Sequence, residues 1–400
     1  MAGPLPTAAP ASQGFSPERL SRLHARMQEF VDGGKHSGIL SLIARNGKVV
    51  DQRAWGYRDL ERKLPMEADT IVRVYSMSKI VTSVAALMLH EEGRLKLDDP
   101  ITKYLPGFEK LRVFKGGTAR APVLVAAKTP ITVQHLLTHT AGFIYGFGQG
   151  PLQTIYNRQP GPLQAPTMDE FVARVAKLPL AHEPGERFSY GLNTDLVGAI
   201  VEKVSGQPFE VFLRTRIFEP LEMRDTSFTV PPEKRDRLAK LYAPDKNGVL
   251  AEAPVEGTPY PDPDGRLFPS GGGGLFSTIG DFARFGQMLL NGGELDGARI
   301  LGRKAVELME VNHLAHLARP TTEFSLSDGF GLGGAVRVNL SRPAQLGSVG
   351  QFGWSGAATT YVNIDPKERT VALVFTQHFP HNQHDLFFQF STLMYAALVD

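Results

Sequence analysis

The sequence predicts an α/β (α+β) protein in which one antiparallel sheet is flanked by helices. Strand-like apolar segments lie near both ends of the 400-residue chain, and helical patterns with long Pro/Gly loops fill the middle. At roughly 150 residues per domain, this length suggests two or three units. We therefore expect a loose tail over residues 1–14, an α/β domain built from residues 15–98 and 269–400, and a mostly helical domain inserted over residues 99–268.

The N-terminal part predicts a helix followed by a hairpin. Ser16 is typical of an N-cap, and apolar residues then repeat on one face until Gly33. Two apolar segments, residues 39–44 and 49–55, flank Asn46-Gly47. This dipeptide favours a tight hairpin turn because both of its residues accept a positive φ.

Capping residues and apolar periodicity predict the remaining elements. Thr167 and Thr278 each precede an acidic residue at the third helical position, which is typical of a helix start. The predicted helices span residues 167–178, 193–204, 282–290 and 385–398, and the predicted C-terminal strands span residues 331–338, 359–364 and 370–376.

Composition excludes several classes of function. The 43 Lys and Arg nearly balance the 41 Asp and Glu, so we expect neither a nucleic acid nor an anionic membrane as a partner. The absence of cysteine excludes disulfides, thiolate nucleophiles and zinc sites with sulfur ligands. Residues 1–14 are rich in Pro and Ala and lack the pattern of a signal peptide, and no segment is apolar enough to span a membrane. We expect a cytoplasmic protein.

Ser76-Met77-Ser78-Lys79 is the first group of residues that could carry chemistry. It follows an apolar segment and begins a helical pattern, so Ser76 and Lys79 would share one face of the helix start. A serine hydroxyl needs a neighbouring base before it becomes a good nucleophile, and a partly desolvated lysine can supply one. The alternative is an N-capping serine beside a solvated lysine.

Two later segments could complete such a site. Tyr190 lies in the loop before the 193–204 helix, where a phenol could relay a proton between Ser76 and a leaving alcohol. Trp354-Ser355-Gly356 precedes a strand, and a backbone N–H there could form an oxyanion hole together with that of Ser76. Tyr190 and Trp354 could instead be ordinary packed rings.

Metal chemistry has little support. His135 and His139 have the spacing of a zinc pair, but Leu136 stands where a His-Glu-x-x-His motif needs its glutamate. The histidines near Pro380, which are His378, His381 and His384, are more typical of solvated loop residues than of ligands. We expect no metal and no cofactor.

Taken together and in this order, these motifs resemble the serine β-lactamase-like superfamily. The similarity is strongest to the family VIII carboxylesterases, which look like class C β-lactamases and share features with statin side-chain acyltransferases. It begins near Gly38 and includes Leu136–Gly142, Tyr190–Leu192, Ser270–Gly273, Phe330–Gly333 and Trp354–Gly356. The resemblance implies a serine β-lactamase-like fold, Ser76 as the acyl-forming nucleophile, Lys79 and Tyr190 as the proton-handling pair, and the N–H groups of Ser76 and Ala357 as the oxyanion hole.

Two departures from the β-lactamase pattern bear on the substrate. Trp354-Ser355-Gly356 replaces the Lys-Thr-Gly that would bind a carboxylate, and Leu192 replaces the asparagine of Tyr-x-Asn. An indole suits a neutral ester better than an anionic lactam. We expect Trp354, Gly356, Phe143, Tyr145 and Phe276 to contact the substrate.

The sequence thus predicts a carboxylesterase that cleaves small-molecule esters with short to medium acyl chains through a Ser76 acyl-enzyme, with weak β-lactam hydrolysis possible. Three alternatives stay open: a β-lactamase or D-Ala-D-Ala peptidase, an acyltransferase that uses the same acyl-enzyme, and a non-catalytic binding module. The sequence does not fix the oligomeric state.

Overall fold

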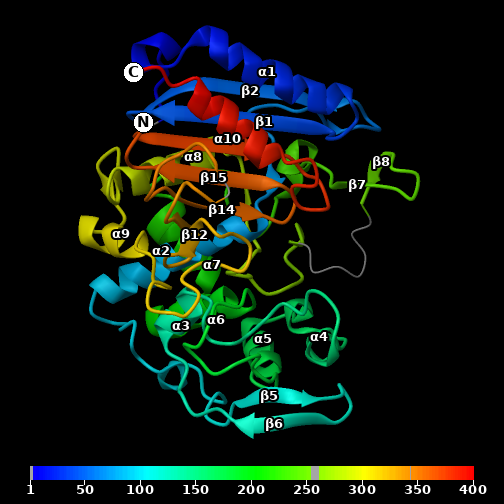
Figure 1. Ribbon diagram of the computed structural model, residues 1–400, viewed down its shortest axis with the longest axis vertical. Helices are drawn as coiled ribbons and strands as arrows, with labels where there is room; N and C mark the ends of the chain where they lie inside the picture. Colours follow the sequence, from blue (N-terminus) through cyan, green and yellow to red (C-terminus); the bar gives the residue numbers. More distant parts are fainter. Residues whose placement is uncertain (1–2, 254–260, 343) are drawn as a thin grey trace.

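An eight-stranded antiparallel sheet forms the centre of the computed structural model, which describes residues 3–253, 261–342 and 344–400 (Figure 1). Its order is β12-β13-β14-β15-β16-β1-β2-β3. The strands are β1 (Gly38–Arg45), β2 (Lys48–Asp59), β3 (Leu64–Pro65), β12 (Asp328–Phe330), β13 (Ala335–Arg337), β14 (Phe352–Gly356), β15 (Thr360–Asp365) and β16 (Thr370–Phe375). The prediction that both chain ends build one antiparallel sheet is confirmed.

The N-terminal and C-terminal strands pair in the middle of the sheet. β1 pairs with β16, with Leu40 opposite Phe375, and with β2 through the predicted hairpin. Asn46 and Gly47 have φ values of 52° and 78° in the hairpin turn, as their residue types allow. Because β1 is buried over nearly its whole length, its sequence is apolar except for Ser41 and the terminal Arg45.

Helices cover both faces of this sheet (Figure 1). α1 (Pro17–Asp32) and α10 (Leu386–Ala396) pack together on one face, and α8 (Ile279–Leu290) contacts β1, β15 and β16 on the other. The side chains of Ser16 and Thr278 accept the N–H groups of Arg19 and Asp281, so the predicted N-caps are present. These helices confirm the predicted layers.

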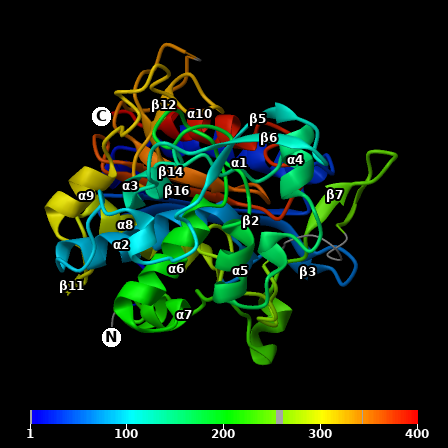
Figure 2. The same ribbon diagram turned by 90° about the horizontal axis from the view of Figure 1, so that it is seen from below.

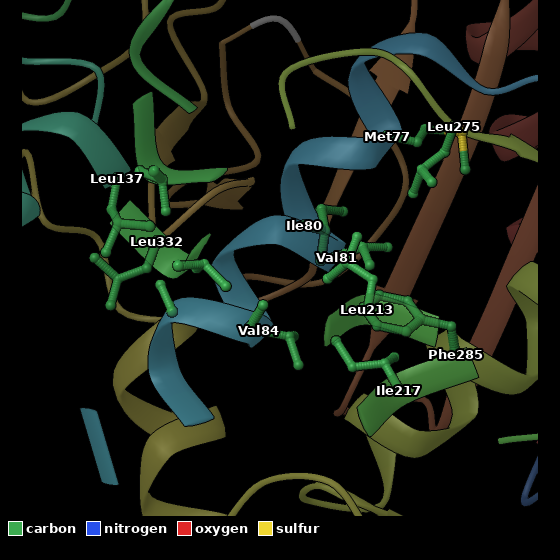
Figure 3. Close-up of a cluster of buried hydrophobic side chains, with 14 of the residues drawn as sticks. Met77, Ile80, Val81, Val84, Leu137, Leu213, Ile217, Leu275, Phe285 and Leu332 are labelled. Atoms are coloured by element: carbon green, nitrogen blue, oxygen red, sulfur yellow. The ribbon is translucent and has the colours of Figure 1, made fainter. Parts of the chain in front are cut away.

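α2 (Ser78–Glu91) is a deeply buried helix near the site. Every side chain from Ser78 to Leu89 is buried, which explains why apolar residues run without interruption from Val84 to Leu89 and are not confined to one face. Ile80, Val81 and Val84 lie in a cluster that includes residues from distant segments (Figure 3). α2 also packs against α6 (Asn193–Ser205), and both are visible from below in Figure 2. The first turn of α2 therefore holds its side chains inside the protein.

The middle of the chain contains five α-helices and two hairpins among its described residues. The helices are α3 (Val133–Leu137), α4 (Pro151–Tyr156), α5 (Met168–Val175), α6 and α7 (Phe209–Leu213), and the hairpins are β5 (Arg112–Gly117) with β6 (Pro122–Ala126) and β7 (Tyr242–Pro244) with β8 (Leu250–Glu252). Sequence patterns predicted α5 and α6 but not the hairpins. The other elements are β4 (Val72–Arg73), β9 (Phe276–Ser277), β10 (Glu294–Leu295), β11 (Ala298–Arg299) and α9 (Arg303–Met309).

Two expectations differ from the structure. The predicted strand 331–338 is instead the end of a short hairpin, because the chain turns at residues 331–334 between β12 and β13. Residues 3–14, expected as part of a loose tail, are held against the sheet: the N–H of Ala8 donates to the carbonyl of Val49, and Leu5 is buried. Within the described segments, none of the helices has the length and apolar character needed to cross a bilayer.

Candidate active site

Ser76 lies at a strained turn between β4 and α2. Residues 75–77 form a single 3-10 turn that leads directly into α2. Tyr75 has a φ of 45°, in the left-handed region that side chains other than glycine rarely adopt. Such strain concentrates at functional sites because the surrounding structure has to enforce it. The turn leaves Ser76 partly exposed at the start of a buried helix.

Lys79 is fully buried directly behind Ser76. Its Nζ lies 3.1 Å from Ser76 Oγ, 3.0 Å from the hydroxyl of Tyr145 and 2.6 Å from the carbonyl oxygen of Gly272. The lysine side chain has no exposed surface. The structure therefore brings the predicted serine and lysine together, with the serine facing solvent and the amine enclosed.

These three contacts restrict the chemistry of the amine. A carbonyl oxygen can only accept, so one N–H of Lys79 points at Gly272. The hydroxyls of Ser76 and Tyr145 can each donate or accept. When the amine is neutral, its lone pair can face the Ser76 hydroxyl and remove its proton, as a general base must.

The phenol whose hydroxyl contacts Lys79 is Tyr145, not Tyr190. Tyr145 was expected to contact substrate, but its hydroxyl bonds to the amine. Burial, with the negative charge of Asp195 and the neighbouring Tyr190 as further causes, raises the pKa of Tyr145 well above its usual value. Tyr145 is therefore a neutral phenol that can pass a proton but does not hold a negative charge. Its loop after α3 has no regular pattern that could have shown this contact.

Tyr190 lies beside the amine but bonds elsewhere. The centre of its ring is 4.7 Å from Lys79 Nζ, and its hydroxyl accepts a hydrogen bond of 3.0 Å from Trp354 Nε1. Tyr190 and Trp354 are both partly exposed. The predicted tyrosine and tryptophan thus form one wall next to the Ser76–Lys79 pair, with the phenol hydroxyl held by the indole.

His139 supports this wall from inside. It is fully buried, and its Nδ1 accepts the N–H of Gly191 at 3.3 Å, while its ring centre lies 4.8 Å from that of Tyr190. Burial and the positive charge of Lys79 lower the pKa of His139 well below 6.5. The ring is neutral and fixes the loop that carries Tyr190.

The end of β14 packs against the backbone that precedes Ser76. A Cβ at Gly356 would overlap the carbonyl oxygen of Val74, so only glycine allows this approach. Thr360 Oγ1 also donates to the carbonyl of Val74, at 3.3 Å. Ala357, which follows Gly356, packs against the cluster that contains Tyr75, the residue before Ser76.

Two residues expected in the pocket lie in the core instead. Phe143 and Phe276 have no exposed surface. Phe143 packs with Phe108, and Phe276 lies in a cluster with Ile71 and Val230. Their sequence neighbourhoods, a glycine-rich loop and the end of a glycine run, do not distinguish a buried ring from a pocket wall.

The histidines singled out in the sequence do not gather around a metal. His135 caps the start of α3, whereas His139 lies beyond its end. His378 and His384 group with His36, and His381 contacts Ser355 Oγ at 3.0 Å. Across the described ranges, no group of three or more His, Asp or Glu residues is arranged to hold a metal ion.

Comparisons with known proteins identify the family of this chain. The family model described as Beta-lactamase matches residues 23–387. Protein Rv1367c of Mycobacterium tuberculosis is 35% identical over 370 residues, covering 89% of each chain. Esterase EstB of Burkholderia gladioli is 31% identical over 285 residues, which is 66% of this chain and 68% of EstB. The solved structure of EstCE1, a hydrolase with promiscuous acyltransferase activity, has a TM-score of 0.75 and 26% identity and covers 94% of this chain and 98% of its own. The chain therefore belongs to the β-lactamase family, as a β-lactamase-fold hydrolase similar to esterases.

Proposed function

We propose that this protein is a carboxylesterase that cleaves esters with short to medium acyl chains through an acyl-enzyme on Ser76. The observation that carries the proposal is the 3.1 Å contact between the partly exposed Ser76 hydroxyl and the fully buried Lys79 amine. A nucleophile open to substrate and a base shielded from water are what covalent ester cleavage requires. The resemblance to EstB supports the ester as substrate.

The proposed reaction has two stages, acylation and deacylation of Ser76. Ser76 Oγ attacks the ester carbonyl carbon while its proton passes to Lys79 Nζ, and the N–H groups of Ser76 and Ala357 stabilise the oxyanion. The carbon–oxygen bond to the alcohol then breaks, and the leaving oxygen takes a proton from the Tyr190 hydroxyl, which regains one from the protonated Lys79 amine. Water gives a proton to the neutral Lys79 amine as its oxygen attacks the acyl carbonyl carbon; the bond from that carbon to Ser76 Oγ then breaks, Oγ takes the proton back from Lys79, and the acid is released.

Trp354 supports a neutral substrate. By the resemblance to β-lactamases it replaces the lysine of their Lys-Thr-Gly motif, and its indole packs next to Tyr190. A carboxylate would find no cation from this residue, whereas an ester group would lose nothing by lying against it. β-Lactam hydrolysis is accordingly expected to be weak.

The test is covalent labelling together with turnover. The wild-type protein should hydrolyse p-nitrophenyl butyrate, and a fluorophosphonate should add to a peptide that contains Ser76, as located by mass spectrometry. Ser76→Ala should lose turnover and labelling while retaining its circular dichroism spectrum. Ser78→Ala is a less informative control because Ser78 Oγ accepts the N–H of Leu275 in the core. Ser21→Ala, at an exposed residue of α1, is preferable. Turnover that survives in Ser76→Ala would reject the proposal.

Substrate comparison separates the alternatives. A β-lactamase would turn over nitrocefin faster than a neutral ester, and an acyltransferase would transfer the acyl group to an added alcohol in preference to water. Because EstCE1 is a hydrolase with promiscuous acyltransferase activity, the product of acyl transfer should be measured by chromatography alongside the free acid. A non-catalytic binding module would give no labelled peptide.

A further inference from the structure

A buried carboxylate lies behind the site and has no role in the steps above. Asp195 is the third residue of α6 and has no exposed surface. Its Oδ1 accepts the hydroxyl of Ser270 at 2.5 Å and the N–H of Gly272 at 3.0 Å. Its Oδ2 is buried and has no hydrogen-bond partner among the described residues. Burying a carboxylate lowers the free energy of unfolding, so a neutral side chain would stabilise the fold better if the role of this position were only structural.

Gly272 connects this carboxylate to the amine. Its N–H donates to Asp195, and its carbonyl accepts from Lys79 Nζ at 2.6 Å. A Cβ at Gly272 would overlap Oδ2 of Asp195, so the carboxylate and the glycine are in direct contact. The position of the carbonyl that orients Lys79 therefore depends on Asp195.

The charge of Asp195 also acts on the site. Burial raises the pKa of Asp195, and the positive charge of Lys79 and the hydrogen bonds from Ser270 and Gly272 oppose that rise. The same negative charge raises the pKa of Tyr145, after the larger effect of burial. The charges of Asp195 and Lys79 and the phenol of Tyr145 therefore influence one another behind Ser76, where Asp195 and Lys79 have no exposed surface.

We propose that Asp195 is a positioning residue for Lys79. It holds the Gly272 carbonyl that accepts one N–H of the amine, which leaves the lone pair of the neutral amine free to face Ser76. Its negative charge also acts on the Lys79 amine and on the Tyr145 phenol. The proposal rests on the proposed function, because it assigns Lys79 the role of base. It predicts that Asp195 affects the chemical step rather than substrate binding.

Asp195→Asn is the main test, since asparagine keeps the shape and one accepting oxygen but removes the charge. Ester hydrolysis should lose about 10-fold to 100-fold in kcat, with KM changed by no more than a few-fold. Removal of the negative charge should also shift the acidic limb of the kcat/KM profile by about one pH unit to lower pH. A purely structural residue would lower the fraction of active protein without moving this limb.

Two further variants separate charge from geometry. Ser270→Ala removes one hydrogen bond to the carboxylate but keeps its charge, so it should lower kcat by a smaller factor and leave the acidic limb in place. Gly272→Ala places a methyl group against Oδ2 and should lower kcat by about 10-fold or more. If Asp195→Asn does not fold, Ser270→Ala and Gly272→Ala test the proposal by themselves. A wild-type kcat in both variants would overturn it.

Asp281→Asn is the matched control. Asp281 is also the third residue of its helix, and its Oδ2 accepts the N–H of Asp225 and the hydroxyl of Thr226, in a different part of the protein. Its substitution should leave the pH profile unchanged. A wild-type protein without esterase activity would refute the proposed function, whereas an active wild type with an unmoved profile in Asp195→Asn would refute only the role of Asp195.

Discussion

At the scale of single residues, three contacts hold the Lys79 amine in the site. Lys79 contacts a hydroxyl that can become a nucleophile, a phenol and a carbonyl oxygen. The Ser-x-x-Lys spacing was sufficient to predict the first contact because residues three apart share a helix face. The other two come from loops, and loop sequences do not reveal which of several nearby tyrosines reaches the amine. Tyr190 was predicted for that place, and Tyr145 occupies it.

A comparison of the two phenols resolves their roles. Tyr190→Phe should lower kcat by about 100-fold if the Tyr190 hydroxyl delivers the proton to the leaving alcohol. Tyr145→Phe removes one hydrogen bond from an amine that keeps two others, so we expect a loss nearer 10-fold. Steady-state hydrolysis of p-nitrophenyl butyrate measures both. A larger loss in Tyr145→Phe than in Tyr190→Phe would transfer the relay to Tyr145.

At the scale of elements, local signals and long-range packing contributed differently. The caps at Ser16 and Thr278 and the Asn46-Gly47 turn are chemical requirements of short segments, so the sequence predicted those elements closely. Most residues of the hairpin β5–β6 are half-exposed or exposed, so its strands show little alternation of apolar and polar residues. Its turn also lacks an Asn-Gly dipeptide, so the sequence did not predict this hairpin. The turn at residues 331–334, which replaces the first half of the predicted strand 331–338, depends on Gly333, whose φ of 95° suits a turn and not a strand.

The stability of α2 can be tested without touching the catalytic groups. Ile80 is fully buried in the main hydrophobic cluster, next in sequence to Lys79. Ile80→Ala should lower the free energy of unfolding by about 3 kcal/mol through lost burial and the cavity left behind. Urea denaturation followed by circular dichroism measures the change. Val123→Ala, at a residue 55% exposed on β6, should stay within about 0.5 kcal/mol of wild type; equal effects at the two positions would mean that α2 is not a packed core helix.

At the scale of the whole molecule, the two chain ends are joined at several places besides the sheet. The N–H of Val399 donates to the carbonyl of Gly14, and Arg45 pairs with Asp400 at 2.7 Å. Apolar patterns at both ends were sufficient to predict a shared sheet, but the packing of residues 3–14 depends on single backbone contacts that leave no pattern in the sequence.

A buried histidine cluster at this junction should make the fold sensitive to acid. His36 precedes β1, and its ring centre lies 4.7 Å from that of His378 after β16 and 5.6 Å from that of His384 before α10. Burial, followed by the charges of His378, His384 and Lys35, lowers the pKa of His36 from 6.5 to about 2. Below pH 6.5 the unfolded chain then binds a proton that the folded chain does not, so the stability present above pH 6.5 is lost as the pH falls.

Between pH 6.5 and pH 5, His36 alone should account for a loss of about 2 kcal/mol in the free energy of unfolding. His36→Gln cannot take up a proton, so its stability should fall less steeply over this interval, whatever its stability at pH 7. Urea titrations at half-unit steps of pH measure both slopes. His316→Gln, at a residue exposed in the folded chain, provides the control and should follow the wild-type slope. If His36→Gln also follows that slope, the two chain ends are not held together by a histidine that must stay neutral.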